Sequence, residues 1–554
     1  MTRRLDFQTH PDRYRHWRLR VEPPFAYLLL DVDEAGGWFE GYQLKLNSYD
    51  IGVDIELADA VQRLRFEHPD VRAVLLGSAR SGTFCAGANI RMLAGASHEH
   101  KVNFCKFTNE TRNSIEDATR LGGQIYVAAL NGTAAGGGYE LALAAERILL
   151  IDDGKAAVSL PEVPLLAVLP GTGGLTRVVD KRRVRRDIAD VFCTLEEGMQ
   201  GRRAVEARLV DEAIPGSRFE ARCQEVMAEC ARLSMRGEAG GRVVLEPLEK
   251  RLSGDAIDYR HVRVTIDRDA CTAGVTLLAP DDPSVPVDIA AAVAQGSAFW
   301  PLALMRELDD ALLELRFNET AIGTLLLRTQ GDPSLVLAYD ALLNDGSDGG
   351  FLAEVRLLVR QVLSRLDLTS RSLFALLEPG SCFAGFLAEL AFAADRAYML
   401  EGQFEDMGEV PPATLTLTAG NFGAYPMVNG LSRLAVRFLG EPDSLTAAKG
   451  LICQSLLAAD AAGAGLVTVA MDDIDWDEEL RLALEERTGF SPDALTGMEA
   501  NLRFAGPETM QSKIFARLSA WQNWIFQRPN AVGDNGALKR YGTGKRPEFG
   551  RHRV

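Results

Sequence analysis

The feature that most constrains how this chain folds is an internal repeat. Five segments of the first half recur in the second half in the same order, at offsets of 245, 251, 249, 256 and 257 residues. One match between alanine-rich helices could arise by chance, but five collinear matches predict two copies of one domain with small loop changes. The paired segments are Tyr14–Arg18 with Tyr259–Arg263, Glu56–Phe66 with Glu307–Phe317, Glu140–Arg147 with Glu389–Arg396, Gly174–Arg177 with Gly430–Arg433, and Ala204–Val210 with Ala461–Val467.

The repeat also sets the expected domain boundaries. A chain of 554 residues is too long for one ordinary hydrophobic core. We expect a first domain over residues 1–256, a second copy over residues 257–492, and a C-terminal helical and tail region over residues 493–554, outside the repeat.

Strand-like and helix-like segments alternate within each copy. In the first copy, apolar runs at 26–31, 71–78 and 124–130 predict strands, and the spacing of apolar residues over 53–66 and 139–150 predicts helices. Such alternation is typical of α/β architecture.

Charge and composition argue against several classes of function. The formal net charge of −17 disfavours general nucleic-acid binding. No apolar run approaches the roughly 18 residues of a membrane span, and residues 1–20 lack the apolar core of a targeting segment. The eight cysteines form no Cys-x-x-Cys pair and the seven histidines have no metal-ligand spacing. We therefore expect a reducing, cytoplasmic location and no metal or other cofactor.

One basic run, Lys181–Arg186, stands out against this acidic background. It is either a solvated helix face or a local contact for an anionic cofactor or partner, which an acidic protein would need.

Two glycine-bearing turns carry the candidate chemistry. Phe84–Ile90 follows the strand predicted at 71–78, and Asn131–Glu140 joins the strand predicted at 124–130 to the next helix. Small residues let a ligand approach the backbone closely, and the N–H groups at the start of a helix near Gly137 are free to donate. Two N–H groups that converge on one oxygen form an oxyanion hole, although each turn taken alone is more often only structural.

Together with two later segments, these turns resemble the crotonase (enoyl-CoA hydratase) family. Phe84–Ile90 resembles that family's Phe-x-Ala-Gly-Ala-Asp loop, and Gly136–Glu140 resembles its Gly-Gly-Gly-x-Glu turn. Pro161–Gly174 resembles its Pro-Glu … Pro-x-x-Gly-Gly-Thr segment, and Ala204–Pro215 its Ala-x-x-x-Gly-Leu-Val-x-x-Val-x-Pro segment. The resemblance implies tandem crotonase-like domains of the ββα-superhelix type and an acyl-CoA thioester as substrate.

The resemblance also implies roles for four residues. The backbone N–H groups of Ala88 and Gly137 would hold the thioester carbonyl, and Glu140 and Glu162 would be the acid/base carboxylates. The residues themselves agree with this assignment. Glu140 opens an otherwise apolar helix, where the helix dipole favours its charge and its neighbours disfavour it. Glu162 is a lone acid in an apolar stretch. The alternative for Glu140 is a helix-start acid with no further role.

The remaining site predictions concern the first loop and the helix after it. By the resemblance, Ala86, Asn89 and Arg91 would contact substrate, with Arg91 near the adenine and phosphates; a solvated charge is its alternative. Asn89 stands where the family commonly has Asp, which leaves a role for that carboxylate in question. Cys105 lies on the helix expected to cover the acyl group, as either a packing thiol or a third catalytic group.

The second copy has lost this constellation. Phe386 stands at the position of Gly137, and no glycine occurs around residues 338–340, where the first loop would fall. Residues 411–413 occupy the place of Glu162, with Glu409 slightly out of register, and Glu389 alone is retained, in place of Glu140. We interpret the second copy as a degenerate crotonase domain that replaces contacts between subunits, and we expect a homodimer.

The doubled arrangement distinguishes this chain from simpler family members. Multifunctional fatty-acid oxidation proteins carry a Gly-x-Gly-x-x-Gly fingerprint in their second half, and none occurs here. A degenerate second copy followed by a basic tail at 530–546 resembles the ring-opening lyases of the family. This implies hydrolytic opening of 2,3-epoxybenzoyl-CoA, or its dihydrodiol, with release of formate. The alternatives are a hydratase or isomerase for another acyl-CoA and a non-catalytic acyl-CoA-binding scaffold.

Overall fold

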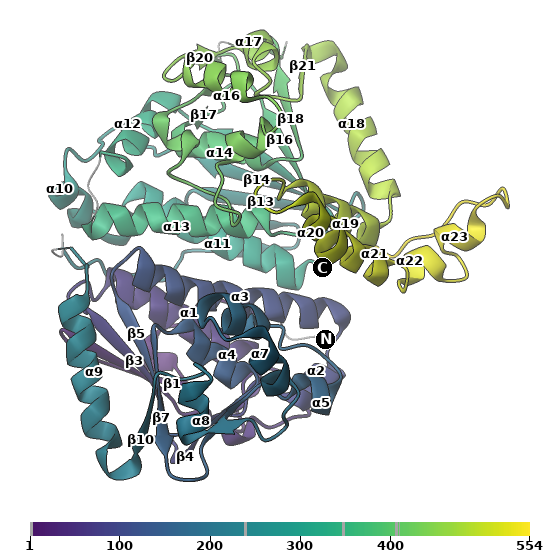
Figure 1. Ribbon diagram of the computed structural model, residues 1–554. Helices are drawn as coiled ribbons and strands as arrows, with labels where there is room; N and C mark the ends of the chain where they lie inside the picture. The colour runs from purple at the N-terminus through teal and green to yellow at the C-terminus, as the bar shows by residue number, and fades with distance from the viewer. Residues whose placement is uncertain (1–3, 238–240, 346–348, 405–407, 409) are drawn as a thin grey trace. The chain divides into compact units, whose positions relative to one another are not determined.

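The computed structural model describes residues 4–237, 241–345, 349–404, 408 and 410–554. The contacts divide the chain into two compact units, Met1–Pro247 with Asp348–Glu354, and Leu248–Ser347 with Val355–Val554. We call these the first unit and the second unit (Figure 1). The boundary at residue 256 stays a prediction.

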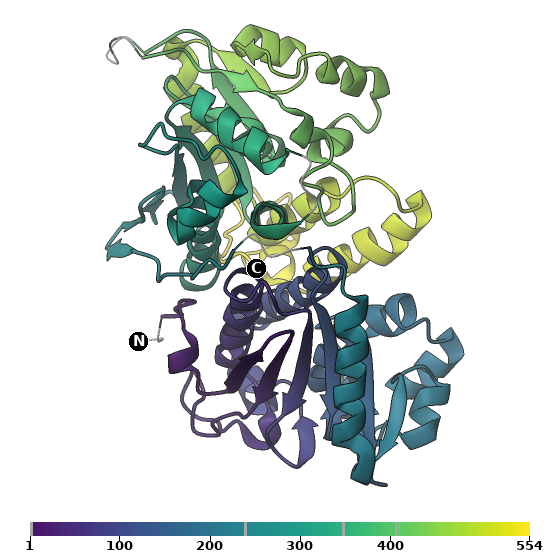
Figure 2. The same ribbon diagram turned by 90° about the vertical axis from the view of Figure 1, so that its left-hand side faces the viewer.

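A six-stranded sheet in the order β1-β2-β3-β5-β7-β10 forms the centre of the first unit. Only the β1–β2 pair is antiparallel. Helix α9 (Phe219–Leu233) packs on one face, where its buried side chains meet Tyr27, Leu75 and Val127, and it runs along the sheet in Figure 2. The strands are β1 (Trp17–Glu22), β2 (Phe25–Leu30), β3 (Ala73–Ser78), β5 (Ile125–Leu130), β7 (Arg147–Asp152) and β10 (Glu212–Pro215).

The other face of this sheet is covered by α1 (Ile51–Phe66), α3 (His98–Arg120) and α4 (Gly137–Ala144) (Figure 1). The strands and the helix predicted before residue 131 are confirmed. The helix predicted over 139–150 is wrong beyond Ala144, because the apolar run that follows is the buried strand β7. A short apolar run does not by itself distinguish a buried strand from a helix.

A second, smaller sheet of the first unit positions the glycine turns. It has four strands in the order β4-β6-β8-β9. The loop predicted at 84–90 leaves β4, and the turn before α4 leaves β6, which pairs with β4 in parallel. Neighbouring parallel strands bring the two turns to the same edge of the sheet. The strands are β4 (Gly82–Cys85), β6 (Gly132–Ala135), β8 (Ala157–Ser159) and β9 (Met199–Gln200).

The second unit is built around an eight-stranded sheet in the order β11-β12-β13-β14-β15-β16-β18-β21. From β13 onward it repeats the pattern of the first sheet, one antiparallel pair followed by parallel pairs. Helix α18 (Asp473–Gly489) packs on it through Trp476. The strands are β11 (Arg251–Ser253), β12 (Ala256–Asp258), β13 (Val262–Asp267), β14 (Thr272–Leu278), β15 (Thr324–Gln330), β16 (Ser372–Leu377), β18 (Arg396–Leu400) and β21 (Val469–Met471).

The repeated sequence motifs make the same contacts in both units. In the first unit, the carboxylate of Glu56 accepts hydrogen bonds from the backbone N–H groups of His16 (2.9 Å) and Trp17 (3.1 Å). In the second unit, Glu307 accepts one from His261 (2.6 Å). Each motif therefore fastens the first long helix of its unit to the start of the sheet. The accompanying tyrosines also correspond: Tyr14 donates to Asp59 (2.5 Å) and Tyr259 to Asp310 (2.7 Å).

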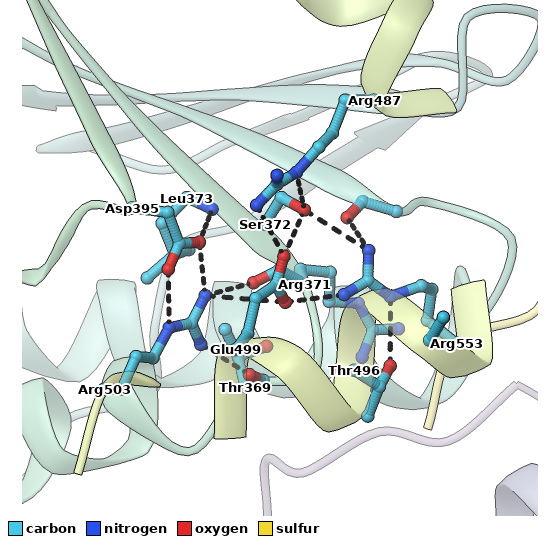
Figure 3. Close-up of polar contacts among 12 residues, drawn as sticks. Thr369, Arg371, Ser372, Leu373, Asp395, Arg487, Thr496, Glu499, Arg503 and Arg553 are labelled. Carbon is cyan, nitrogen blue, oxygen red and sulfur yellow. Dashed lines mark hydrogen bonds and ion pairs between the residues drawn. The ribbon is translucent and has the colours of Figure 1, made fainter. Parts of the chain in front are cut away.

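Residues beyond 492 pack within the second unit through a buried polar network (Figure 3). Glu499, on α19 (Pro492–Leu502), accepts hydrogen bonds from Ser372 (2.5 Å), Arg487 (2.9 Å) and Arg553 (2.6 Å). Arg503 forms an ion pair with Asp395 (2.6 Å). These contacts tie the C-terminal segment to the start of strand β16, since buried charges require such partners.

Candidate active site

The two glycine turns converge as the sequence predicts. A Cβ atom on Gly87 (φ +84°) would lie 2.8 Å from the amide nitrogen of Gly137, so only glycine fits there. The N–H group of Gly137 is in the first turn of α4, and neither it nor that of Ala88 donates to another described residue. The arrangement leaves two backbone donors free beside each other, which is the requirement of an oxyanion hole.

Glu140 is buried and fixed at both oxygens. It lies in the first turn of α4 with 2% of its surface exposed. Its Oε1 atom accepts a hydrogen bond from the N–H group of Gly174 (2.7 Å), and its Oε2 atom accepts one from the hydroxyl of Thr172. The turn at 170–174 therefore sets the orientation of this carboxylate.

Glu162 has a different environment, although it lies close to Glu140. It begins α5 (Glu162–Leu166), and its Oε2 atom is buried without a hydrogen-bond partner among the described residues. Burial and, to a lesser extent, the negative charge of Glu140 together raise the pKa of Glu162 to about 7. A carboxyl group with a pKa near neutrality can both accept and donate a proton, as an acid/base catalyst must.

Cys105 lies beside the same turn, on α3. Its Sγ atom is 4.0 Å from the position of a Cβ atom on Gly171, and the side chain of Asn109 bonds the carbonyl oxygens of both residues (3.0 Å each). Burial, with Glu140 as a lesser cause, raises the pKa of this thiol to about 11. At neutral pH it is therefore a neutral, weak hydrogen-bond donor and not a thiolate.

The structure gives the three predicted substrate contacts different settings. Ala86 and Arg91 are exposed, and Arg91 lies on α2 (Ile90–Gly95). Asn89 is buried and caps α2, with its Oδ1 atom accepting from Met92 (3.0 Å) and its Nδ2 atom donating to Gln43 (2.8 Å). Its side chain therefore holds the loop together, and contact of these residues with substrate stays a prediction.

Part of the basic run at 181–186 is engaged within the first unit. Lys181 donates to Glu116 (2.9 Å) and to the carbonyl oxygen of Ala144 (2.8 Å), and Arg182 pairs with Asp211 (3.1 Å). Two of the five cations thus connect elements of the fold, whereas the other three are exposed.

The sequence interpretation missed three residues around this site. Thr172 holds Glu140, while Tyr49 and Arg112 are buried behind Gly137, where Arg112 donates to the hydroxyl of Tyr49 (2.8 Å) and to the carbonyl oxygen of Gly137 (3.0 Å). One signal could have found Arg112. It follows Phe104 and Thr108 at intervals of four residues, on the buried face of α3.

In the second unit, the apolar side chain of Phe386 stands at the position that corresponds to Gly137. Phe386 packs on Trp300 with ring centroids 5.5 Å apart. Helix α12 (Pro333–Leu343) occupies the sequence position of the first loop. Glu389 forms a buried ion pair with Arg433 (2.9 Å). Glu409, the acid nearest the position of Glu162, lies outside the described residues.

In the part of the chain that the structure describes, no helix has both the length and the apolar character to cross a membrane. The same residues contain no group of three or more His, Cys, Asp or Glu side chains placed to hold a metal ion.

A protein family and several known proteins are similar to this chain. The sequence profile of the enoyl-CoA hydratase/isomerase family matches residues 44–267. The chain is similar to a benzoyl-CoA-dihydrodiol lyase of Aromatoleum evansii, with 53% identity over 551 residues, 99% of this chain and 98% of the relative. It shares 34% identity over 154 residues with a fatty acid oxidation complex subunit alpha of Idiomarina loihiensis, 28% of this chain and 21% of that protein. Among solved structures, an enoyl-CoA hydratase of Geobacillus kaustophilus is 30% identical over 40% of this chain and 75% of its own, with a TM-score of 0.35.

Proposed function

Because this chain belongs to the enoyl-CoA hydratase/isomerase family, and within it to the benzoyl-CoA-dihydrodiol lyases, we propose that it opens the ring of 2,3-epoxybenzoyl-CoA or its dihydrodiol. Two water molecules add to the epoxide, or one to the dihydrodiol, a ring carbon–carbon bond breaks, and formate leaves together with a semialdehyde thioester. The observation that carries the proposal is the convergence of two free backbone N–H groups, at Ala88 and Gly137, with the carboxylates of Glu140 and Glu162.

In this reaction the oxyanion hole would serve as the electron sink. When the ring bond beside the thioester breaks, negative charge moves onto the thioester oxygen, and the N–H groups of Ala88 and Gly137 would hold that oxygen. A preorganised donor of this kind contributes about 2.7–4 kcal/mol to transition-state stabilisation.

The carboxylates would divide the proton transfers. Glu162 has one oxygen free of partners and a pKa of about 7, which suits the base that activates water. Glu140, held at both oxygens, would orient the second water and return a proton. The neutral thiol of Cys105 would act as a weak donor to the opened ring. Arg91 would face the phosphates of coenzyme A.

We further propose that the reaction uses no cofactor other than the coenzyme A of the substrate, because hydrolytic ring opening transfers no electrons to an acceptor. Turnover should therefore persist after dialysis against a metal chelator. Loss of turnover that a divalent metal restores would overturn this part of the proposal.

The second unit is, in our proposal, a degenerate copy of the first with a structural role. The shared strand pattern and the equivalent contacts of Glu56 and Glu307 support the common origin. The side chain of Phe386 at the position of Gly137 supports the loss of catalysis. We also propose a homodimer and a cytoplasmic location, which sedimentation and cell fractionation would test.

One assay separates this function from its alternatives. Purified protein is incubated with 2,3-epoxybenzoyl-CoA, and formate is followed with a formate dehydrogenase; in parallel, hydration of crotonyl-CoA is followed. We expect formate release to be the faster reaction. Faster hydration of crotonyl-CoA would favour an ordinary hydratase, and binding of both esters without turnover would favour a scaffold.

A further inference from the structure

Tyr49 touches both halves of the oxyanion hole. Its backbone N–H donates to the carbonyl of Gly87 (3.0 Å), and its carbonyl accepts from the N–H of Asn89 (2.9 Å). In such a parallel bridge the residue between the two partners directs its own N–H to the opposite side. Tyr49 therefore turns the N–H group of Ala88 away from the bridge, where it donates to no described residue.

The side chain of Tyr49 reaches the other half. A Cβ atom on Gly137 would lie 2.1 Å from its hydroxyl oxygen, so this oxygen packs directly on the backbone that presents the second N–H group. Arg112 fixes the contact from behind, because one of its nitrogens, Nη2, donates both to the Tyr49 hydroxyl (2.8 Å) and to the Gly137 carbonyl (3.0 Å).

Arg112 is itself held in place by buried partners. Its Nη1 atom donates to the carbonyl of Thr108 (3.0 Å) and lies 3.8 Å from the carboxylate of Asp54. The side chain of Arg112 is 1% exposed and that of Asp54 is 4% exposed. Burying such a pair carries a large desolvation cost, and apolar side chains of similar size would stabilise the fold equally well.

The second unit shows that apolar replacement. At the repeat offset of 251 residues, Tyr49 corresponds to Trp300 and Asp54 to Met305. Trp300 packs against Phe386, which stands where the first unit has Gly137. Two members of the polar set behind the hole, Tyr49 and Asp54, are thus replaced by apolar residues in the unit where the position of Gly137 is filled.

We propose that Tyr49, anchored by Arg112 and Asp54, is a positioning residue that fixes the Ala88 and Gly137 N–H groups relative to each other. It acts through the backbone and does not touch substrate. A test of this inference by turnover rests on the proposed function. Polarisation of a bound thioester carbonyl, in contrast, reports on the two N–H groups directly.

The test compares Tyr49→Phe with Tyr425→Phe, which removes an equally buried hydroxyl from the second unit. The probe is benzoyl-CoA labelled with ¹³C at its carbonyl, observed by infrared difference spectroscopy. We expect the wild type and Tyr425→Phe to shift the carbonyl stretch to lower frequency, and Tyr49→Phe to lose much of that shift. Turnover of Tyr49→Phe should fall by about 10- to 100-fold with KM nearly unchanged, as for a displaced catalytic donor.

A second pair of variants tests the anchor. Arg112→Lys keeps a donor and should recover part of the carbonyl shift, whereas Arg112→Met should not. A full shift of the carbonyl stretch in Tyr49→Phe would overturn the inference, and so would a loss of turnover that a smaller folded fraction fully explains. Both outcomes can be observed even if Arg112→Met fails to fold. If the wild type polarises the carbonyl but releases no formate, the proposed function fails while the positioning role stands.

Discussion

The carboxylate of Glu162 lies directly against the backbone of Gly136, where a Cβ atom would be 2.6 Å from its Oε1 atom. Gly136 has a φ of +52°, a conformation that residues with a side chain rarely adopt. The next residue, Gly137, contributes an N–H group to the proposed oxyanion hole. One short turn therefore sets the separation between the proposed base and the oxygen that it serves.

Gly136→Ala should lower turnover by about 100-fold, because the methyl group displaces Glu162 and the adjoining N–H group from their working positions. Gly154→Ala is the matched control. Gly154 also has a positive φ (+76°), but a Cβ atom there meets nothing within 4 Å. Formate release and thermal unfolding are measured for both. Equal losses of turnover in the two variants would mean that backbone strain alone accounts for the effect.

Glu140→Gln and Glu162→Gln should each reduce turnover by about 100-fold or more while benzoyl-CoA binding is retained, because the amide cannot exchange a proton. Formate release and calorimetric binding are the measurements. Wild-type turnover in both variants would disprove the acid/base assignment.

The raised pKa of Glu162 also predicts how stability depends on pH. The folded protein holds this proton up to about pH 7, whereas the unfolded chain releases it near 4.5, so its contribution to stability falls as pH rises through this window. Glu162→Gln has no such loss. The melting temperature of the variant minus that of the wild type should therefore be larger at pH 8 than at pH 5. Glu56 and Glu307, with pKa values also raised to about 7 by burial, titrate in both proteins and cancel. A pH-independent difference would contradict the prediction.

If the thiol donates a hydrogen bond, Cys105→Ala should lower turnover by more than any change in its melting temperature can explain. Cys105→Ser should then keep part of the activity. Alkylation by iodoacetamide should stay slow at pH 7 and accelerate toward the thiol pKa of about 11. Cys223→Ala, on the buried face of α9, is the control. If Cys105 only packs, both of its variants should change stability by about 1 kcal/mol and leave turnover per folded molecule intact.

Glu389→Gln should leave turnover unchanged and destabilise the second unit by about 3 kcal/mol, because Arg433 loses a buried counter-ion. Chemical denaturation and formate release are the measurements. Glu441→Gln, an exposed acid, serves as control. A large loss of turnover in a stable Glu389→Gln protein would show that the second unit takes part in catalysis.

The parts of the candidate site that the sequence predicts lie on short local segments. Ala88, Gly137 and Glu140 belong to turns whose glycine pattern reports backbone geometry directly, and the structure brings these turns together with Glu162 and Cys105. The sequence does not predict Tyr49, which is joined to Arg112 by the fold from 63 positions away.

Two features of the fold were also beyond a sequence argument. The sequence of strand β7 predicts a continuation of α4, because its four apolar residues fit either period. The buried contacts of residues beyond 492 with strand β16 involve charged side chains, and a sequence pattern assigns such side chains to the surface.

The ion pair of Glu389 with Arg433 bears on how reversible the proposed loss of catalysis in the second unit is. Changing Phe386 to glycine would reopen space, but the retained glutamate is already committed to an arginine that is 1% exposed. Freeing the acid leaves that arginine with Asp367 alone, and removing the arginine leaves two carboxylates buried together. Each of these first steps back toward activity thus destabilises the fold before any catalysis returns. On our proposal, the loss of catalysis after the duplication is therefore difficult to reverse in evolution, because the residue that is a catalytic acid in one copy is a structural counter-ion in the other.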